Sequence, residues 1–134
     1  MVQATRPDID IRDEIYDMVA HYPPLQADRH HFTVDVRDGN VTLSGHVKSP
    51  ITERYFGDRV KEIRGVLSLN DDRLYNEEEI RLEVGRRIPT GVIANTVYGN
   101  VILTGAPPQG KSGEAVVNDV AQVPGVQRVI TQFA

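Results

Sequence analysis

The 134-residue chain has no cysteine and no tryptophan. This excludes disulfide bonds, a thiol nucleophile, and zinc or iron–sulfur sites built on cysteine. No stretch approaches the ~20 apolar residues of a membrane-spanning helix. The first ten residues also lack the apolar run of about 7 to 15 residues that a secretion signal needs. We therefore expect a cytoplasmic location, with any membrane contact peripheral.

What is present is the composition of an ordinary soluble globular protein, with 40% hydrophobic and 25% charged residues. Acidic residues outnumber basic ones by 19 to 15, which gives a net charge of −4. Because contacts to phosphate come chiefly from Lys and Arg, this balance argues against nucleic acid as a partner.

The sequence contains an internal repeat. Residues 39–45 and 99–105 lie 60 positions apart and are identical at five of seven positions. The same offset relates residues 63–66 to 123–126, and Phe56 and Val60 to Val116 and Val120. The chain is therefore interpreted as a tandem duplication.

Each copy begins with a predicted short helix. In the first copy Ile11, Ile15 and Val19 recur at helical spacing behind Asp8 or Asp10 as N-cap, and residues 23–24, both proline, end the helix. In the second copy Ile80, Val84 and Ile88 recur in the same way behind Asn76.

A hairpin follows in each copy. With Gly39 and Asn40 as the loop, Val36 faces Leu43 on an apolar side. The same register in the second copy places Thr96 opposite Leu103. It also turns Ile93 and Val97 to the other face, where we expect the sister repeat to cover them.

A second helix (residues 50–64 and 112–123) and a last strand complete each copy. A right-handed crossover makes the third strand parallel to the second and puts both helices on one face of the sheet. The predicted fold is therefore α+β, with α-β-β-α-β units at 8–70 and 77–134 and a short linker at 71–76. Six glycines are assigned structural roles in turns and helix ends: Gly39, Gly45, Gly65, Gly99, Gly105 and Gly125.

These motifs resemble the BON family (bacterial OsmY and nodulation). The resemblance rests on residues 34–36, 39–45 and 65–66 in the first copy and on residues 99–105 and 125–126 in the second. It implies a non-enzymatic binding or scaffolding module that associates with phospholipid surfaces or partner proteins, often in stress responses such as osmotic stress. It brings no catalytic residues and no cofactor.

Residues 105–112 match the phosphate-binding string G-x-x-x-x-G-K-[ST]. Such a loop binds phosphate through consecutive backbone N–H groups, which Pro107 and Pro108 lack. We interpret Ser112 as an ordinary helix N-cap and Lys111 as a loop residue.

The remaining polar residues suggest no chemistry. Adjacent His30 and His31 point to opposite faces of an extended chain, so we predict no metal site. Asp35 and Asp38 flank a turn, where Asp is favoured for its own backbone hydrogen bonds, so we predict no catalytic residues.

The second helix of the first copy is the most basic element. The residues proposed to contact a lipid or a partner are Lys48, Arg54, Tyr55, Arg59, Lys61 and Arg64. Together they predict contact with anionic phospholipid or an acidic protein surface. Asp58 and Glu62 dilute the charge, so a merely solvated face is the alternative. The alternative function is a soluble adaptor or self-associating scaffold, which includes a homo-oligomer.

Overall fold

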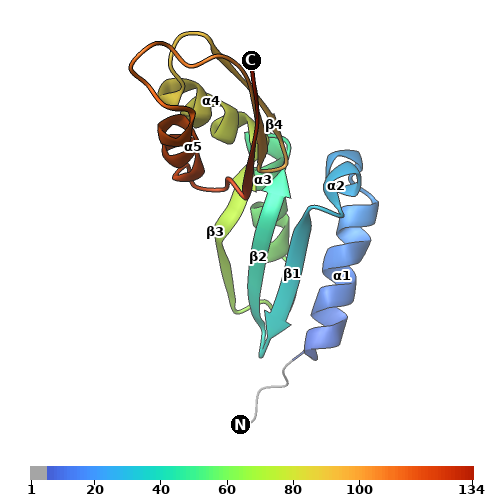
Figure 1. Ribbon diagram of the computed structural model, residues 1–134. Helices are drawn as coiled ribbons and strands as arrows, with labels where there is room; N and C mark the ends of the chain where they lie inside the picture. The colour runs from blue at the N-terminus through green and yellow to red at the C-terminus, as the bar shows by residue number, and fades with distance from the viewer. Residues whose placement is uncertain (1–5) are drawn as a thin grey trace.

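The computed structural model describes residues 6–134. The cytoplasmic location was expected partly from the first ten residues, and some of these lie outside the described residues. The chain has an α+β fold of two similar units, as predicted, and the second unit is stacked on one end of the first (Figure 1). The first unit contains α1 (Asp8–Ala20), α2 (Pro23–Asp28), β1 (Phe32–Arg37), β2 (Asn40–Val47), α3 (Pro50–Lys61) and β3 (Ser68–Asn76). The second contains α4 (Glu77–Arg87), β4 (Val92–Val97), β5 (Asn100–Gly105), α5 (Gly113–Ala121) and β6 (Arg128–Phe133).

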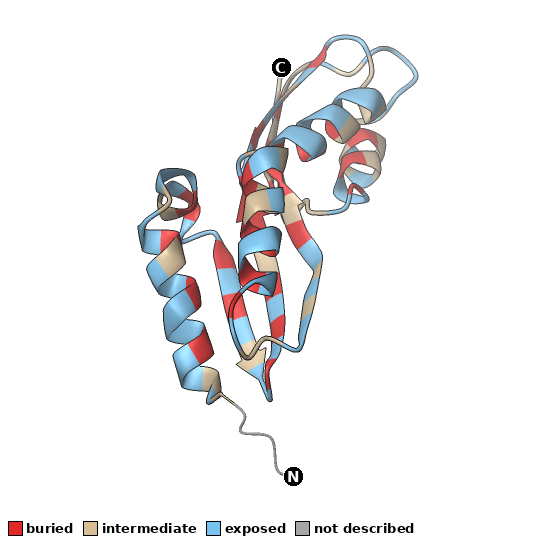
Figure 2. Ribbon diagram, turned by 180° about the vertical axis from the view of Figure 1, so that it is seen from behind, coloured by how far each residue is buried: buried red, intermediate tan, exposed pale blue. Residues whose placement is uncertain are grey.

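Each unit has a three-stranded sheet, in the orders β1-β2-β3 and β4-β5-β6. The first two strands are antiparallel and the third runs parallel to the second, which confirms the predicted strand directions. Both long helices of the first unit pack on one face of its sheet, where the buried residues gather (Figure 2).

Two separate hydrophobic cores result. The predicted helical stripes are buried in them, and Ile11, Ile15, Phe56, Val84 and Val116 are fully covered. Ile88 is the exception, because α4 ends at Arg87 and Ile88 is only partly buried. Each such side chain contributes about 1.5–3 kcal/mol relative to an exposed one. Burial of these cores therefore supplies most of the free energy that stabilises each unit.

The hairpin loops differ from the prediction by one residue. Asp38 and Gly39 form the first loop, with φ of 52° and 81°, and Val34 pairs with Leu43. Tyr98 and Gly99 form the second, with φ of 48° and 84°. A two-residue hairpin loop of this type needs positive φ at both positions, and Asp adopts it more readily than most residues. The predicted pairing with Val36 opposite Leu43 was therefore wrong by two residues, which leaves every side chain on its predicted face.

The start of α1 was also predicted wrongly. Pro7 is the N-cap residue and no side chain caps the helix. The Asp8 carboxylate instead accepts hydrogen bonds from the backbone N–H groups of Asp38 and Gly39, at 2.8 and 2.9 Å. Asp8 therefore fixes the first hairpin loop against α1.

The two prolines at 23–24 follow the end of α1 and begin α2, a helix that was not predicted. Proline is accepted in the first turn of a helix, where its missing N–H would have no helical partner. Leu25 and Asp28 of α2 are buried. Between its first helix and its hairpin the first copy has nine residues more than the second, since Ile15 to Gly39 spans 24 residues and Val84 to Gly99 spans 15. The six residues of α2 lie in this longer stretch, which is therefore at least partly helical and not a loose loop.

Residues 71–76, expected to be a linker, belong to β3 and pair with β2 as far as Val47 and Asn76. The Asn76 side chain then caps α4 by accepting a hydrogen bond from Glu79 N at 2.8 Å. The second unit thus starts directly where the last strand of the first unit ends.

Candidate binding surfaces

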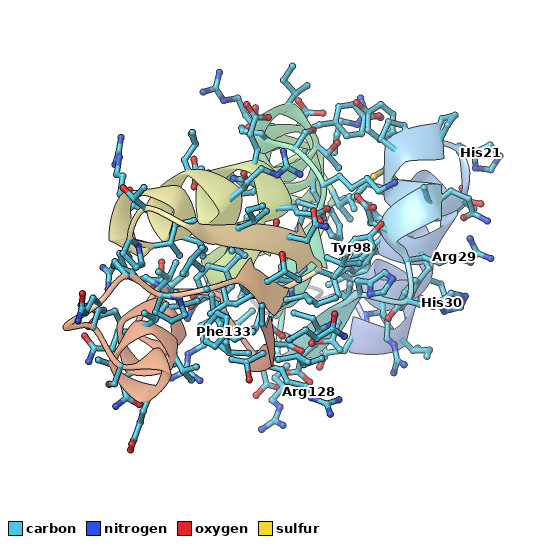
Figure 3. The ribbon with its side chains drawn as sticks, turned by 45° about the horizontal axis from the view of Figure 1, so that its top comes forward. His21, Arg29, His30, Tyr98, Arg128 and Phe133 are labelled. Carbon is cyan, nitrogen blue, oxygen red and sulfur yellow. The ribbon has the colours of Figure 1, made fainter. Side chains whose placement is uncertain are left out.

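The junction between the units contains a buried carboxylate. Asp28 is 1% exposed. Its Oδ1 accepts a hydrogen bond from the Tyr98 hydroxyl at 2.7 Å, and its Oδ2 accepts one from the backbone N–H of Lys48 at 3.0 Å. The Tyr98 ring stacks on His31 with a centroid distance of 3.5 Å. Figure 3 shows Tyr98 between the strands of the second unit and the segment that carries Arg29 and His30.

A histidine forms the second part of the junction. His46 is 3% exposed, and its Nε2 lies 2.6 Å from the carbonyl oxygen of Gly125. Its Nδ1 lies 3.2 Å from Nε2 of Gln127. These partners suit a neutral ring that donates from Nε2 and accepts at Nδ1. A Cβ at Gly99 would overlap His46, so this loop position requires glycine. Both polar groups of the junction are paired, which makes it a structural contact.

The start of α3 presents a different kind of surface. Ser49 caps the helix by accepting a hydrogen bond from Thr52 N at 3.1 Å. Ile51 is 76% exposed, although most isoleucines of the chain are buried or partly covered. Arg54 lies one helical turn beyond it and is exposed. A hollow of about 290 Å³ lies beside Ile51, with the lining Pro50, Ile51, Arg54, Tyr55 and Asp58.

The predicted contact residues divide into groups. Lys48 is exposed just before α3, and Lys61 is exposed two turns beyond Arg54 on the outward side. Arg64 lies beyond the end of α3, where its carbonyl accepts a hydrogen bond from Arg6 at 3.1 Å. The structure therefore leaves Lys48, Arg54 and Lys61 along the outward side of α3 and places Arg64 apart.

Arg59 and Tyr55 face α1. They line a groove of about 360 Å³ together with the acidic residues Glu14, Asp17 and Glu62. Arg59 forms an ion pair with Glu62 at 3.8 Å, and Tyr55 stacks on Tyr22 with centroids 3.7 Å apart. The charge of Arg59 is thus largely offset by its neighbours, and this residue contributes little to a basic surface.

The remaining candidates have structural roles in the described residues. Ser112 caps α5 by accepting a hydrogen bond from Ala115 N, as predicted, and Lys111 pairs with Asp119 at 3.1 Å. Each of the six structural glycines has positive φ. Within residues 6–134, no group of three or more histidine, aspartate or glutamate side chains is arranged to hold a metal ion.

Sequence reasoning missed Ile51, Asp28 and Tyr98. Ile51 could have been noticed because it directly follows the Ser-Pro helix start and lies off the buried stripe of Phe56 and Val60. No periodic signal identifies Asp28 or Tyr98, because their contact joins residues 70 positions apart.

The fold and the junction define a protein of two stacked α+β units. The model of the BON domain matches residues 7–74, slightly more than half of the chain. The chain belongs to the BON family, as its motifs predicted.

Two solved structures share the fold. One is the C-terminal domain of CdsD, described as the structural protein of the type III secretion system of Chlamydia trachomatis. It aligns with a TM-score of 0.80 and 14% identity over 98% of this chain and 68% of that chain. A second CdsD structure aligns with a TM-score of 0.75 and 14% identity, covering 98% of this chain and 64% of that one. This chain therefore spans about two thirds of the CdsD chains, and the likeness shows the fold alone.

A comparison with functionally curated proteins finds no match. Within residues 6–134, none of the helices combines the length and the apolar character needed to cross a bilayer.

Proposed function

We propose that this protein is a non-catalytic binding module that contacts anionic phospholipid at a membrane surface through the start of α3. The observation that carries the proposal is Ile51, which is 76% exposed and flanked by the exposed cations Lys48 and Arg54. An apolar side chain beside basic ones is the arrangement by which peripheral helices insert into the headgroup region. The family resemblance supports the same partner.

The expected affinity is modest. Each basic residue near an anionic surface contributes about 1 kcal/mol, and burying Ile51 adds about 1.5 kcal/mol or more. Lys48, Arg54 and Lys61 with Ile51 then supply about 4–5 kcal/mol, less the repulsion of Asp58. With that repulsion subtracted, the dissociation constant is on the order of 1 mM. Binding of this kind is reversible and sensitive to salt. A role in osmotic stress would depend on this contact.

Sedimentation with vesicles tests the proposal. The intact chain should pellet with phosphatidylglycerol vesicles at low salt, stay in solution with pure phosphatidylcholine vesicles, and lose binding above physiological salt. The double variant Ile51→Ser with Arg54→Glu should bind at least tenfold more weakly, because it removes the apolar contact and reverses one charge.

The matched control is Leu82→Ser with Arg81→Glu on α4. Leu82 is 57% exposed and Arg81 is exposed beside it, so the control changes the same kinds of side chain on the other unit. It should bind vesicles like the unmodified chain. Equal loss in the two double variants, or no binding of the unmodified chain at low salt, would contradict the phospholipid contact.

A second candidate is a protein adaptor within a membrane-linked assembly. Apolar side chains exposed on the second sheet favour this candidate, and CdsD, which shares the fold, is a structural protein of a secretion system. Absence of vesicle binding at every salt concentration would favour this candidate over the first.

A further inference from the structure

The second sheet has an apolar outer face. Its strands turn alternate side chains away from the core, and Ile93 and Val97 among them are 64% and 51% exposed. The expectation that the sister repeat covers them was wrong, because the second unit stacks through its loop end at Tyr98 and Gly125. The outer face consists of Ile93, Asn95 and Val97 on β4, Asn100, Ile102 and Thr104 on β5, and Arg128, Ile130 and Gln132 on β6.

The first sheet provides an internal comparison, because it has the same topology. The positions that correspond to Ile93 and Ile102 carry Thr33 and Thr42. The positions that correspond to Ile130 and Val97 carry Asn70 and Arg37. The same fold therefore forms with a polar outer face, and folding alone does not require the aliphatic residues of the second sheet. We therefore look for a role of these aliphatic residues other than folding.

We propose that the outer face of the second sheet binds the same face of a second copy of this chain. The proposed two-fold axis lies between the two sheets, perpendicular to the strands, and passes through the row formed by Asn95, Ile102 and Ile130. The interface is isologous, which means that both copies use the same surface. Each side chain must therefore be compatible with the side chain that the two-fold axis places opposite it in the other copy. This inference is independent of the phospholipid contact on α3.

The register shows that the face is self-complementary. This axis keeps each strand opposite its own copy and reverses the order of residues along it. Ile93 then lies over Val97, whereas Ile102 and Ile130 each lie over themselves. The polar residues match as well, with Asn95 over Asn95, Thr104 over Asn100, and Gln132 over Arg128.

The other two-fold axis in this plane, parallel to the strands, matches less well. It would place Arg128 over Val97 and Ile93 over Gln132. Arg128 is the one charged residue among the nine that form the face, and Figure 3 shows its side chain at the margin of the second unit. With the proposed axis, the two Arg128 side chains lie at opposite ends of β6 and do not repel.

The size of the face predicts a weak dimer. Three strands about 4.8 Å apart and six residues long cover an area of roughly 14 by 20 Å. Two such faces bury on the order of 600 Å² in total, about half or less of the ~1,200–2,000 Å² of stable interfaces. The copies should therefore exchange rapidly between monomer and dimer.

Sedimentation equilibrium of the intact chain in lipid-free buffer tests the inference. The weight-average mass should rise from monomer towards dimer between about 10 µM and about 1 mM. The triple variant Ile93→Thr, Ile102→Thr and Ile130→Asn places the residues of the first sheet on the second. It should fold and stay monomeric over this range. A monomeric unmodified chain at about 1 mM, or a folded triple variant that still associates, would overturn the proposal.

A variant at the proposed axis and a control variant on α3 test the proposed face further. Asn95→Lys puts two like charges opposite each other at the proposed axis, so it should weaken association at least tenfold and high salt should partly restore it. Ile51→Ser removes an exposed isoleucine from α3 and should associate like the unmodified chain. Association unaffected by Asn95→Lys, or lost with Ile51→Ser, would contradict the proposed face.

Discussion

Tyr98 adopts a backbone conformation that bulky residues seldom take, with φ of 48°. The corresponding residue of the first unit is Asp38, with φ of 52°, which suits aspartate better. The tyrosine is retained at this strained position by two contacts of its side chain with the first unit, the hydrogen bond to Asp28 and the stack on His31. These two contacts offset the free-energy cost of the strained backbone at Tyr98.

Removing the Tyr98 hydroxyl therefore destabilises the chain. Tyr98→Phe keeps the ring but leaves one oxygen of the buried Asp28 carboxylate without its partner, which costs about 1–3 kcal/mol. The measurement is the free energy of unfolding in urea at pH 7. Tyr16→Phe is the control, because Tyr16 is 40% exposed on α1, and it should change stability by less than about 0.5 kcal/mol.

The same variant has a pH signature. Burial and the hydrogen bond to Asp28, together with the charges of Asp28 and Glu77, raise the pKa of Tyr98. A raised pKa means that the neutral phenol stabilises the folded state fully below the ordinary tyrosine pKa of about 10, and that this stabilisation is lost as pH rises further. The stability difference between the unmodified chain and Tyr98→Phe should shrink above about pH 10. A difference that stays constant there would contradict this assignment.

At the scale of elements, α3, β3 and α4 bring three carboxylates together. Burial raises the pKa of Glu53 most, followed by the charge of Glu79 and, by a smaller amount, that of Asp71. A hydrogen bond with the Asn76 side chain opposes these effects but leaves the pKa of Glu53 raised. Its neutral form therefore stabilises the fold below the ordinary pKa, and this contribution is lost as pH rises through the raised value. At neutral pH the ionised Glu53 is a source of instability.

Glu53→Gln should consequently raise the unfolding midpoint at pH 7 and lose this advantage below about pH 4, where glutamate is protonated. Thermal unfolding at the two pH values measures the effect. Glu78→Gln is the control, because Glu78 is exposed in the first turn of α4, where its negative charge interacts favourably with the helix dipole. It should bring no gain at pH 7. An equal rise in the unfolding midpoint for both variants would contradict this explanation. It would show that the lower net negative charge, and not the position of Glu53 among α3, β3 and α4, stabilises the chain.

The regular elements were predictable because periodic burial encodes them. The stripes of Ile11, Ile15 and Val19 and of Val116 and Val120 are buried as their spacing indicates. The loop residues of the first hairpin were harder to predict, because Asp38-Gly39 and Gly39-Asn40 can both adopt positive φ. Only the pairing of β1 with β2 shows that Asp38 and Gly39 form the loop. The helix α2 was missed because its two prolines were interpreted as a stop, although proline also suits a first turn.

At the scale of the whole molecule, the difference between the two copies explains their docking. The longer stretch of the first copy contains α2, and Asp28 of α2 accepts a hydrogen bond from Tyr98 in the hairpin loop of the second unit. Within residues 6–134 the second unit has no counterpart of α2. The duplication was visible in sequence, but the docking was not, because its hydrogen bonds join residues 70 to 81 positions apart.

The candidate contact surface was predictable in part. The basic residues of α3 are visible in the sequence, yet their sequence order cannot show that Arg59 faces the acidic groove beside α1. Nor can it show that Ile51 remains exposed next to Arg54. The three-dimensional structure therefore narrows the proposed lipid contact from six residues to the start and outward side of α3.

The most direct test is a two-dimensional ¹H–¹⁵N NMR titration of the intact chain with phosphatidylglycerol nanodiscs. The amide signals of residues 48–61 should shift or broaden, whereas those of β4, β5 and β6 should keep the positions they have without lipid. Signals that change on the outer face of the second sheet and not at α3, or that change nowhere in the chain, would contradict the proposed phospholipid contact.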